Sequence, residues 1–275
     1  MPGDDRGLAY GDGVFRTLRV VGGRPGLLDR QLRKLLADAC ALGMEPPGDL
    51  ARTLRREIVG IVAEQQGILR VTLTRGSGPR GYASPATPRL RRVLAFTPLP
   101  PPGLDARPVR LQVARTPLAV SPVLAGVKHL GRLEQVLAAS EPAAAGVFDR
   151  LMCDPGGRPI CGTRCNLFLR RGRRLCTPAL DGSGVAGVVR ELLLECAMAR
   201  APEVIDECIV ARLTLEELAA ADELLVTNSV FGVRAVAECL DVDGAPLFRT
   251  AAPGPLARQL LATLAAEFPA PEPAP

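Results

Sequence analysis

Lys128 is the residue with the clearest chemical potential in this sequence of 275 residues. Only two of its 34 basic side chains are lysines, Lys34 and Lys128, and the others are arginines. A desolvated amine loses its proton and attacks a carbonyl carbon, whereas a guanidinium stays charged. In a chain that uses arginine almost everywhere, a lysine at position 128 therefore indicates a nucleophile. The alternative is a surface lysine without a chemical role.

The surrounding sequence predicts that Lys128 lies at a junction between a strand and a helix. An apolar run, 120–127, precedes it, and a helical pattern follows at 129–140. Residues 184–190 predict a glycine turn before a second helix, whose N-terminus offers N–H groups and a positive dipole to a phosphate. A lysine together with a phosphate site suits a phosphorylated aldehyde cofactor. A glycine turn before a helix is also common for structural reasons alone.

Hydrophobic periodicity predicts a mixed architecture. The first half alternates as strands at 14–21, 67–75 and 89–97, with helices at 29–42 and 48–65. The second half predicts strands at 108–115, 147–153, 158–161, 165–170, 173–177, 203–210, 223–227 and 231–238, and helices at 129–140, from about 190 to 200, at 214–219 and at 255–266. Short strands followed by helices are typical of the α+β class in both halves.

The length of the chain and one proline-rich stretch predict two domains. The expected division is a small α/β domain at 1–96, a stiff linker at 97–103 and a larger α+β domain at 104–268 that carries Lys128. The proline-rich segment 269–275 is expected to be a disordered tail.

Composition argues against several classes of function. The net charge of +5 is spread over the chain, and aromatic residues make up only 3%, so no nucleic-acid groove is expected. No apolar run reaches the ~20 residues of a membrane span, and no signal peptide is recognisable. With one histidine and eight scattered cysteines, of which Cys161 and Cys165 are the closest pair, no metal site is expected. The cysteines predict reduced thiols in a cytoplasmic protein.

One glycine-rich stretch resembles a nucleotide-binding motif by spacing alone. Residues 76–81 (GSGPRG) match G-x-G-x-x-G and follow a predicted strand. The next residues, 82–88, include two prolines and start no helix, whereas a phosphate site of this kind needs a helix N-terminus. A loop is therefore predicted here, and no dinucleotide site.

Four stretches resemble the fold-type IV pyridoxal-phosphate enzymes, which include branched-chain and D-amino acid aminotransferases and aminodeoxychorismate lyases. The opening stretch is 5–15 (DRGLAYGDGVF). Three more are most similar to the lyases: 75–82 (RGSGPRGY), 126–135 (GVKHLGRLEQ) and 184–190 (GVAGVVR). The likeness covers nearly the whole chain. It implies the two-domain fold of these enzymes, pyridoxal 5'-phosphate as cofactor and a homodimer.

The resemblance also implies roles for individual residues. Lys128 falls on the lysine that forms the Schiff base with the cofactor and then moves a proton at the substrate carbon that bears nitrogen. The backbone N–H groups of Val188 and Val189 fall where the phosphate is held, and Val185 falls against the pyridine ring. Asn228 and Ser229 match a second phosphate-binding loop, and candidates for the substrate side of the pocket are Phe15, Arg80 and Tyr82.

This sequence departs from the family pattern at five positions, which include Gln31 in place of a histidine and Gly131 in place of an asparagine. Lys34 stands where the family has an arginine that grips the phosphate, so a point charge replaces a bidentate fork. Cys161 stands where a glutamate faces the pyridine nitrogen and keeps it protonated. Arg16 stands where many relatives have an acidic or small polar residue.

The resemblance therefore implies a lyase that converts 4-amino-4-deoxychorismate to 4-aminobenzoate and pyruvate in folate biosynthesis. Aromatisation of the product helps such an elimination to proceed with a weaker electron sink than an aminotransferase needs. Two alternatives remain open at this point. One is a D- or branched-chain amino acid aminotransferase, and the other is a cofactor-poor, non-catalytic relative, in whose favour Cys161 and Lys34 stand.

Overall fold

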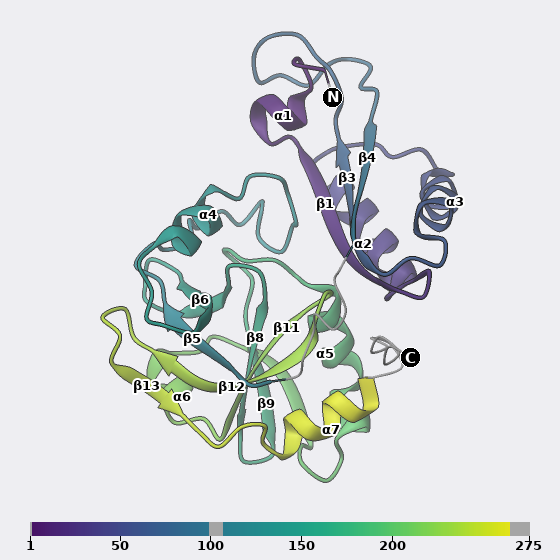
Figure 1. Cartoon of the computed structure of the whole chain (residues 1–275). Coiled ribbons are helices and arrows are strands. Elements are labelled where there is room, and N and C mark those ends of the chain that lie inside the picture. Colours follow the sequence, from purple (N-terminus) through teal and green to yellow (C-terminus); the bar gives the residue numbers. More distant parts are fainter. Residues whose placement is uncertain (1, 99–106, 265–275) are drawn as a thin grey trace. The chain divides into compact units, whose positions relative to one another are not determined.

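The computed structural model describes residues 2–98 and 107–264, which form two compact units (Figure 1). Within these ranges the first unit contains 2–98 and Val127–Arg132, and the second contains 107–126 and 133–264. Lys128 thus groups with the N-terminal unit, whereas the sequence placed it in the domain 104–268. Thr97 and Pro98 of the expected linker belong to a strand, and 99–103 and 269–275 lie outside the described residues.

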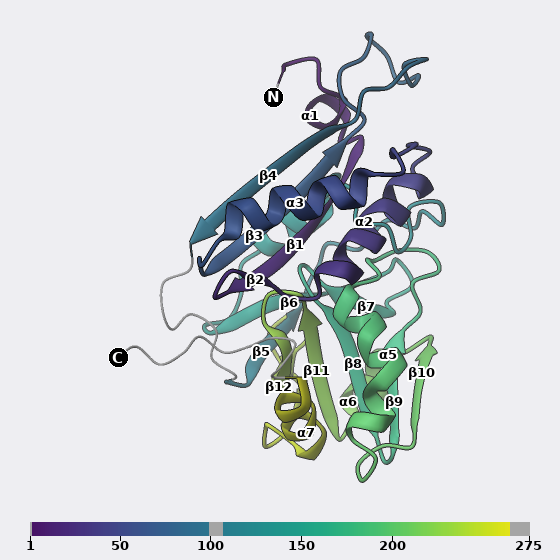
Figure 2. The same cartoon turned by 90° about the vertical axis from the view of Figure 1, so that its right-hand side faces the viewer.

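The first unit is an antiparallel sheet covered by helices. Its four strands pair in the order β2-β1-β3-β4, and α2 and α3 pack on one face (Figure 2). Its elements are α1 (Arg6–Tyr10), β1 (Gly13–Val21), β2 (Arg24–Pro25), α2 (Leu28–Ala41), α3 (Leu50–Val62), β3 (Gly67–Thr74) and β4 (Arg91–Pro98).

Alternation along β1 decides which of its residues enter the core of this unit. Val14, Leu18 and Val20 are buried against apolar residues of α2 and α3, because side chains two apart in a strand share a face. Phe15 and Arg19 lie on the opposite face of the sheet, and both are also buried. The sheet therefore separates an apolar core from a second face that carries polar and aromatic side chains.

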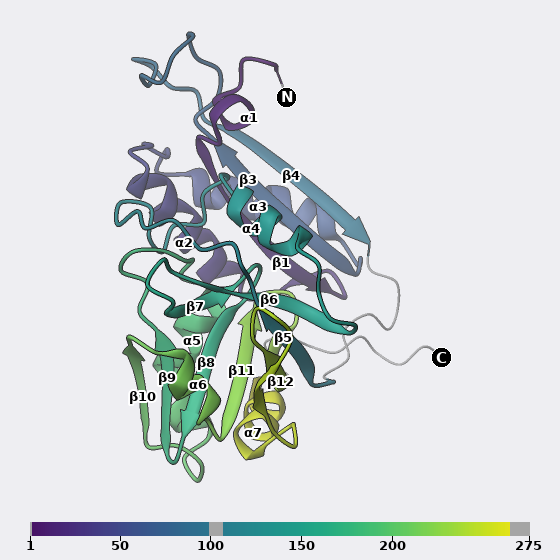
Figure 3. The same cartoon turned by 90° about the vertical axis from the view of Figure 1, so that its left-hand side faces the viewer.

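The second unit is a larger mixed sheet. Its strand order is β10-β9-β8-β11-β12-β5-β6-β7, with β13 beside β12 and a further pairing of β7 with β8; Figure 3 shows β10, β9, β8, β11 and β12 side by side. Its elements are β5 (Val109–Val113), α4 (Leu133–Ser140), β6 (Val147–Cys153), β7 (Pro159–Gly162), β8 (Asn166–Arg171), β9 (Arg174–Pro178), α5 (Val188–Arg200), β10 (Glu207–Ala211), α6 (Leu215–Ala219), β11 (Glu223–Asn228), β12 (Gly232–Leu240), β13 (Pro246–Arg249) and α7 (Pro255–Leu264).

The α+β prediction is confirmed, but the predicted junction at Lys128 is wrong. The run 120–127 forms turns rather than a strand, and α4 begins only at Leu133. His129 forms an isolated bridge with Val14 of β1, and the N–H of Leu130 donates to the carbonyl oxygen of Gly13. Because these residues already pair with a strand, the helical pattern that follows cannot begin before Arg132.

The described part of the chain contains no helix that is both long and apolar enough to cross a membrane.

Candidate active site

The backbone of Lys128 is held at both of its hydrogen-bonding groups. Its N–H donates to Oδ2 of Asp38 on α2 at 3.0 Å, and its carbonyl oxygen accepts from the N–H of Phe15 on β1 at 3.0 Å. The neighbouring residues extend this pairing, because the N–H of Leu130 donates to the carbonyl oxygen of Gly13 at 2.9 Å. Lys128 is therefore fixed on β1 within the first unit.

The amine of Lys128 lies 4.5 Å from the centroid of the Phe15 ring. Loss of hydration at this site, followed by the nearby guanidinium groups of Arg132, Arg16 and Arg70, lowers the pKa of Lys128 to about 7, while Asp38 acts in the opposite direction. Near neutral pH a large fraction of the amine is consequently unprotonated. This is the state in which a lysine attacks an aldehyde carbon.

Two of the three arginines near Lys128 come from neighbouring strands and lie outside the predicted site. Arg16 is on β1 and pairs with Asp38, and Arg70 on β3 places its guanidinium carbon 3.9 Å from the Phe15 ring centroid. Only Arg16 gave a signal in the sequence, as a departure from the family pattern. Arg70 gave none, because its place beside Phe15 depends on the register of β1 with β3.

His129, the one histidine of the chain, follows Lys128 directly. Burial and the neighbouring Arg132 lower the pKa of its imidazole to about 4, so the ring is neutral at pH 7. The guanidinium of Arg132 donates to the carbonyl oxygens of His129 and Val127, at 2.9 Å each. Arg132 thus clamps the turn that follows Lys128.

Lys34 lies on α2, one turn before Asp38, and its side chain is half-buried. The structure joins Lys34 to the surroundings of Lys128 through its main chain, because its carbonyl oxygen accepts from Nη2 of Arg16 at 3.3 Å. Its predicted role at the cofactor phosphate stays a prediction.

Arg80 and Tyr82 lie on the loop between β3 and β4, and both side chains are exposed, Tyr82 by 85%. The buried guanidinium of Arg6 fixes this loop by donating to the carbonyl oxygens of Gly81, Tyr82 and Ala83 at 2.8–3.1 Å. The Tyr82 ring packs edge-on against Tyr10. Within the first unit these two predicted substrate residues are surface residues, unlike Phe15, which contacts Lys128.

In the second unit a short extended segment positions Val185. Gly126 pairs with Val185 in a parallel bridge, and its N–H donates to the carbonyl oxygen of Gly184 at 3.0 Å. Gly184 has a φ of +86°, and a Cβ there would lie 2.7 Å from Leu180 and 2.9 Å from Ile160. Only glycine fits, so this part of the predicted glycine turn is required by the local packing.

The N-terminus of α5 follows at once. Its N-cap residue, Gly187, provides no side chain to bond the first helical N–H groups, which include those of Val188 and Val189. A Cβ at Gly187 would lie 2.2 Å from Oδ1 of Asn166, and Nδ2 of Asn166 donates to the carbonyl oxygen of Val185 at 2.7 Å. Asn166 on β8 therefore braces this turn, a role that the sequence did not reveal.

The second predicted phosphate loop follows β11. Asn228 uses its side-chain oxygen to accept from the N–H groups of Val230 and Phe231, so it shapes the turn around Ser229. Thr227, which precedes it, is fully buried, and within the described residues its Oγ1 has no hydrogen-bond partner. A buried hydroxyl without a partner is costly and has hydrogen-bonding capacity to spare for a polar ligand.

Cys161 lies on β7, paired with Asn166 of β8 and with Met152 of β6. Its side chain is buried in an apolar cluster with Leu118, Met152 and Ile160. Its Sγ would be 3.8 Å from a Cβ at Gly184, so within the second unit Cys161 and the turn that carries Val185 are close neighbours. A glutamate at this position would place a carboxylate in that cluster.

Cys161 and Cys165 lie on opposite faces of the sheet, in different apolar clusters. The chain reverses between Gly162 and Cys165, and Cys165 packs into a different apolar cluster, where its Sγ donates to Oδ2 of Asp149 at 3.2 Å. Throughout 2–98 and 107–264, no group of three or more His, Cys, Asp or Glu side chains is arranged to hold a metal ion.

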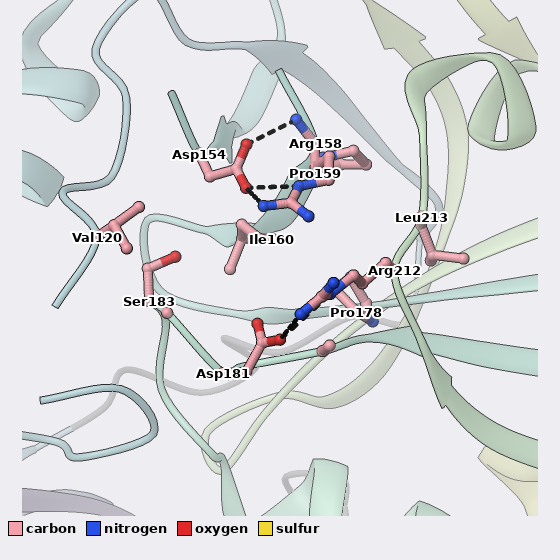
Figure 4. A pocket seen from close by; sticks show the side chains of 12 residues that line it. Val120, Asp154, Arg158, Pro159, Ile160, Pro178, Asp181, Ser183, Arg212 and Leu213 are labelled. Atoms are coloured by element: carbon pink, nitrogen blue, oxygen red, sulfur yellow. Dashed lines mark hydrogen bonds and ion pairs between the residues drawn. The ribbon is translucent and has the colours of Figure 1, made fainter. Parts of the chain in front are cut away.

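A small pocket elsewhere in the second unit is lined by two ion pairs, Asp154 with Arg158 and Asp181 with Arg212 (Figure 4). Its volume is about 40 Å³, which is enough for water. None of the predicted site residues lines it.

The amino-transferase class IV family model matches residues 13–239 of this chain. An aminodeoxychorismate lyase of Vibrio harveyi is 31% identical over 239 residues, which cover 86% of each protein. A putative branched-chain amino acid aminotransferase of Methanocaldococcus jannaschii is 30% identical over 87% of this chain and 82% of its own length. The crystal structure of 4-amino-4-deoxychorismate lyase from Pseudomonas aeruginosa has a TM-score of 0.82 and 40% identity, covering 97% of this chain and 94% of that one.

The matched range includes β1, Lys128, the start of α5 and the loop after β11, so the likeness spans both units. The chain belongs to the class IV aminotransferase family.

Proposed function

We propose that this protein is a pyridoxal-phosphate-dependent lyase that converts 4-amino-4-deoxychorismate to 4-aminobenzoate and pyruvate, a step of folate biosynthesis. The observation that carries the proposal is the amine of Lys128, held over Phe15 with its pKa lowered to about 7. Relatives named for this lyase activity, at 31% and 40% identity, support the substrate assignment.

Of three polar groups of the cofactor, the aldehyde, the phosphate and the pyridine nitrogen, the residues fit the first two. Lys128 provides a weakly basic amine for the aldehyde carbon. The uncapped N–H groups of Val188 and Val189, the unpartnered hydroxyl of Thr227 and the turn at Asn228 and Ser229 provide hydrogen-bond donors for the phosphate. Val185 would lie against the pyridine ring.

At the third polar group of the cofactor, the pyridine nitrogen, this chain differs from the family pattern. Cys161 would face the pyridine nitrogen from an apolar cluster, so no side-chain carboxylate is placed there to hold a proton on that nitrogen. When bound, the cofactor supplies an electron sink for the bond that breaks next to the amine-bearing carbon. The proposed elimination yields an aromatic product, and this driving force lessens the demand on the sink.

The chain's own residues account for the proton transfers. The Lys128 amine, a large fraction of which is unprotonated near neutral pH, would take a proton from the substrate carbon that bears nitrogen and return it to the leaving enolpyruvyl group. Phe15 covers the amine and limits the access of water. Lys34, Arg80 and Tyr82 are proposed as charged and aromatic groups at the phosphate and substrate ends.

The direct test is a product assay with purified protein, added cofactor and 4-amino-4-deoxychorismate. We expect 4-aminobenzoate and pyruvate in equal amounts from wild type and no product from Lys128→Ala. Lys34→Ala should need more added cofactor than wild type to reach the same turnover. Equal amounts of product from wild type and Lys128→Ala would refute the proposal.

The second candidate is an aminotransferase, which the likeness to the Methanocaldococcus jannaschii protein favours. Amino-group transfer from D-alanine or a branched-chain amino acid to 2-oxoglutarate or pyruvate would identify it. If neither activity is found and no cofactor binds, the third candidate, a non-catalytic relative, is correct.

We also propose a cytoplasmic homodimer. None of the eight cysteines, all of which lie in the described residues, forms a disulfide, as is usual in a reducing compartment. Helix α4 exposes three apolar side chains, Leu133, Val136 and Leu137, the first by 76%. Light scattering on the purified protein tests the dimer. A monomeric mass at micromolar concentration would contradict it.

A further inference from the structure

The Lys128 peptide is held by a carboxylate that is itself buried. Asp38 accepts the N–H of Lys128 through Oδ2, and the same oxygen accepts from Nη2 of Arg16 in a short ion pair. The Arg16 and Asp38 side chains are 2% and 9% exposed. A buried carboxylate needs a partner to hold it in position, and Arg16 provides this partner for Asp38.

Two consecutive residues of β1 act on Lys128 from opposite faces of the sheet. Phe15 donates its N–H to the Lys128 carbonyl oxygen and places its ring beside the amine. Arg16, on the other face, reaches α2, where it bonds Asp38 and the carbonyl oxygen of Lys34. The backbone of Lys128 is therefore bonded directly to Phe15 of β1 and to Asp38 of α2, and the Arg16–Asp38 ion pair joins these two elements.

We propose that the buried Arg16–Asp38 pair is a positioning device for Lys128, which fixes the peptide of this residue and so holds its amine over Phe15 in a reactive state. The inference rests on the proposed function, in which the Lys128 amine is the reacting group. The contacts themselves all lie within the first unit. Neither residue needs to touch cofactor or substrate.

The Arg16–Asp38 pair can be tested through its effect on the pKa of the Lys128 amine. The amine faces Arg132 on its own segment, Arg16 on β1, Arg70 on β3 and Asp38 on α2. The three guanidinium groups lower the pKa of Lys128, and the carboxylate raises it. Removal of the Arg16 charge should therefore raise this pKa, and removal of the Asp38 charge should lower it.

The experiment is competitive acetylation of the cofactor-free protein with trace acetic anhydride between pH 5 and 10, read by mass spectrometry. Because the chain has two lysines, Lys34 serves as the reference amine on the same molecule. For Arg16→Gln we expect the Lys128 labelling midpoint to rise by about one pH unit from about 7, which is about a fivefold loss of labelling at pH 7. For Asp38→Asn we expect the midpoint to fall.

Two further variants separate positioning from general packing. Arg16→Lys retains the cation and should keep the wild-type midpoint, whereas a purely structural defect would not be rescued by charge. Arg55→Gln breaks an Arg–Asp pair of α3 and α2 that is exposed, with Asp29, and should leave the midpoint unchanged. If Arg16→Gln does not fold, Asp38→Asn and Arg16→Lys carry the test.

Unchanged midpoints in folded Arg16→Gln and Asp38→Asn would overturn the inference, and so would shifts of the same sign. The labelling uses no cofactor, so its outcome is independent of the proposed function. Expected shifts in a protein that binds no pyridoxal phosphate would refute the function only, and normal lyase turnover with unshifted midpoints would refute the positioning role only.

Discussion

The surroundings of Lys128 and those of Cys161 differ in how they treat charge. Three guanidinium groups and one carboxylate act on the Lys128 amine, and the carboxylate is itself paired. Cys161 lies in an apolar cluster on β7, with Leu118, Met152 and Ile160 around it. Neighbouring charges therefore shift the pKa of the proposed nucleophile. Position 161, which is expected to face the pyridine nitrogen, has a cysteine in place of the family's glutamate.

This difference indicates which part of the chemistry the chain preserves. An elimination that ends in an aromatic product needs a correctly placed base more than a strong electron sink. A transamination needs both, because its intermediate must be protonated and hydrolysed. The contrast between the two regions therefore favours the lyase over the aminotransferase.

The largest effect is expected from a substitution of Lys128, in the more highly charged of the two regions. Lys128→Ala should lower lyase turnover by at least about a thousandfold, because it removes the group that moves the proton. Steady-state production of 4-aminobenzoate measures this loss. A loss of less than tenfold would place the catalytic base elsewhere.

The same lysine should make stability depend on pH. Its folded-state pKa of about 7 lies below the ordinary 10.5, so between these values the unfolded chain binds a proton that the folded chain does not. The free energy of unfolding should then rise with pH across this window, by up to about 1.4 kcal/mol per pH unit from this group. Urea unfolding of wild type and Lys128→Met at pH 7 and pH 9 measures it, and equal slopes in both proteins would contradict it.

A carboxylate at position 161 would place a charge in the surroundings of Cys161, as there already is around Lys128. Cys161→Glu is expected to destabilise the cofactor-free protein by about 2 kcal/mol, because it buries an acid among apolar side chains. If position 161 faces the pyridine nitrogen, added pyridoxal phosphate should restore stability and bind about tenfold more tightly than to wild type. Thermal shift and equilibrium dialysis give both values, and Cys161→Gln is the uncharged control of similar size.

The smallest expected effect concerns the phosphate end. Thr227→Val should weaken binding of pyridoxal phosphate about fivefold, since one hydrogen bond is lost. Binding of pyridoxal, which lacks the phosphate, should not change. The variant should be as stable as wild type because the buried hydroxyl has no partner among the described residues. A loss of pyridoxal affinity equal to that of pyridoxal phosphate would place Thr227 away from the phosphate.

Much of the fold could be predicted because its elements have strong local periodicity. The helix predicted at 29–42 is Leu28–Ala41, and the strand predicted at 147–153 is Val147–Cys153. Strand order could not be predicted, since the pairing of β5 with β12 joins residues far apart in sequence. The short elements α1, β2 and β13 were missed because they carry too few residues for a pattern.

The candidate site was less accessible to sequence reasoning than the fold. The run 120–127 looks like a strand, but turns stabilised by bonds to the Ser121 carbonyl oxygen interrupt it, and pairing with β1 keeps Lys128 out of the helix that follows. The place of Arg70 beside Phe15 follows from strand register, and the bracing role of Asn166 follows from close packing at Gly187. Such effects arise between segments, so no local pattern contains them.

The most direct test of the central claim uses the fact that the chain has only two lysines. The protein is mixed with pyridoxal phosphate, reduced with borohydride, digested and analysed by mass spectrometry. The account predicts a covalent cofactor adduct on Lys128, none on Lys34, and none at all in Lys128→Ala. An adduct confined to Lys34, or the absence of any adduct on Lys128 in the folded wild-type protein, would contradict it.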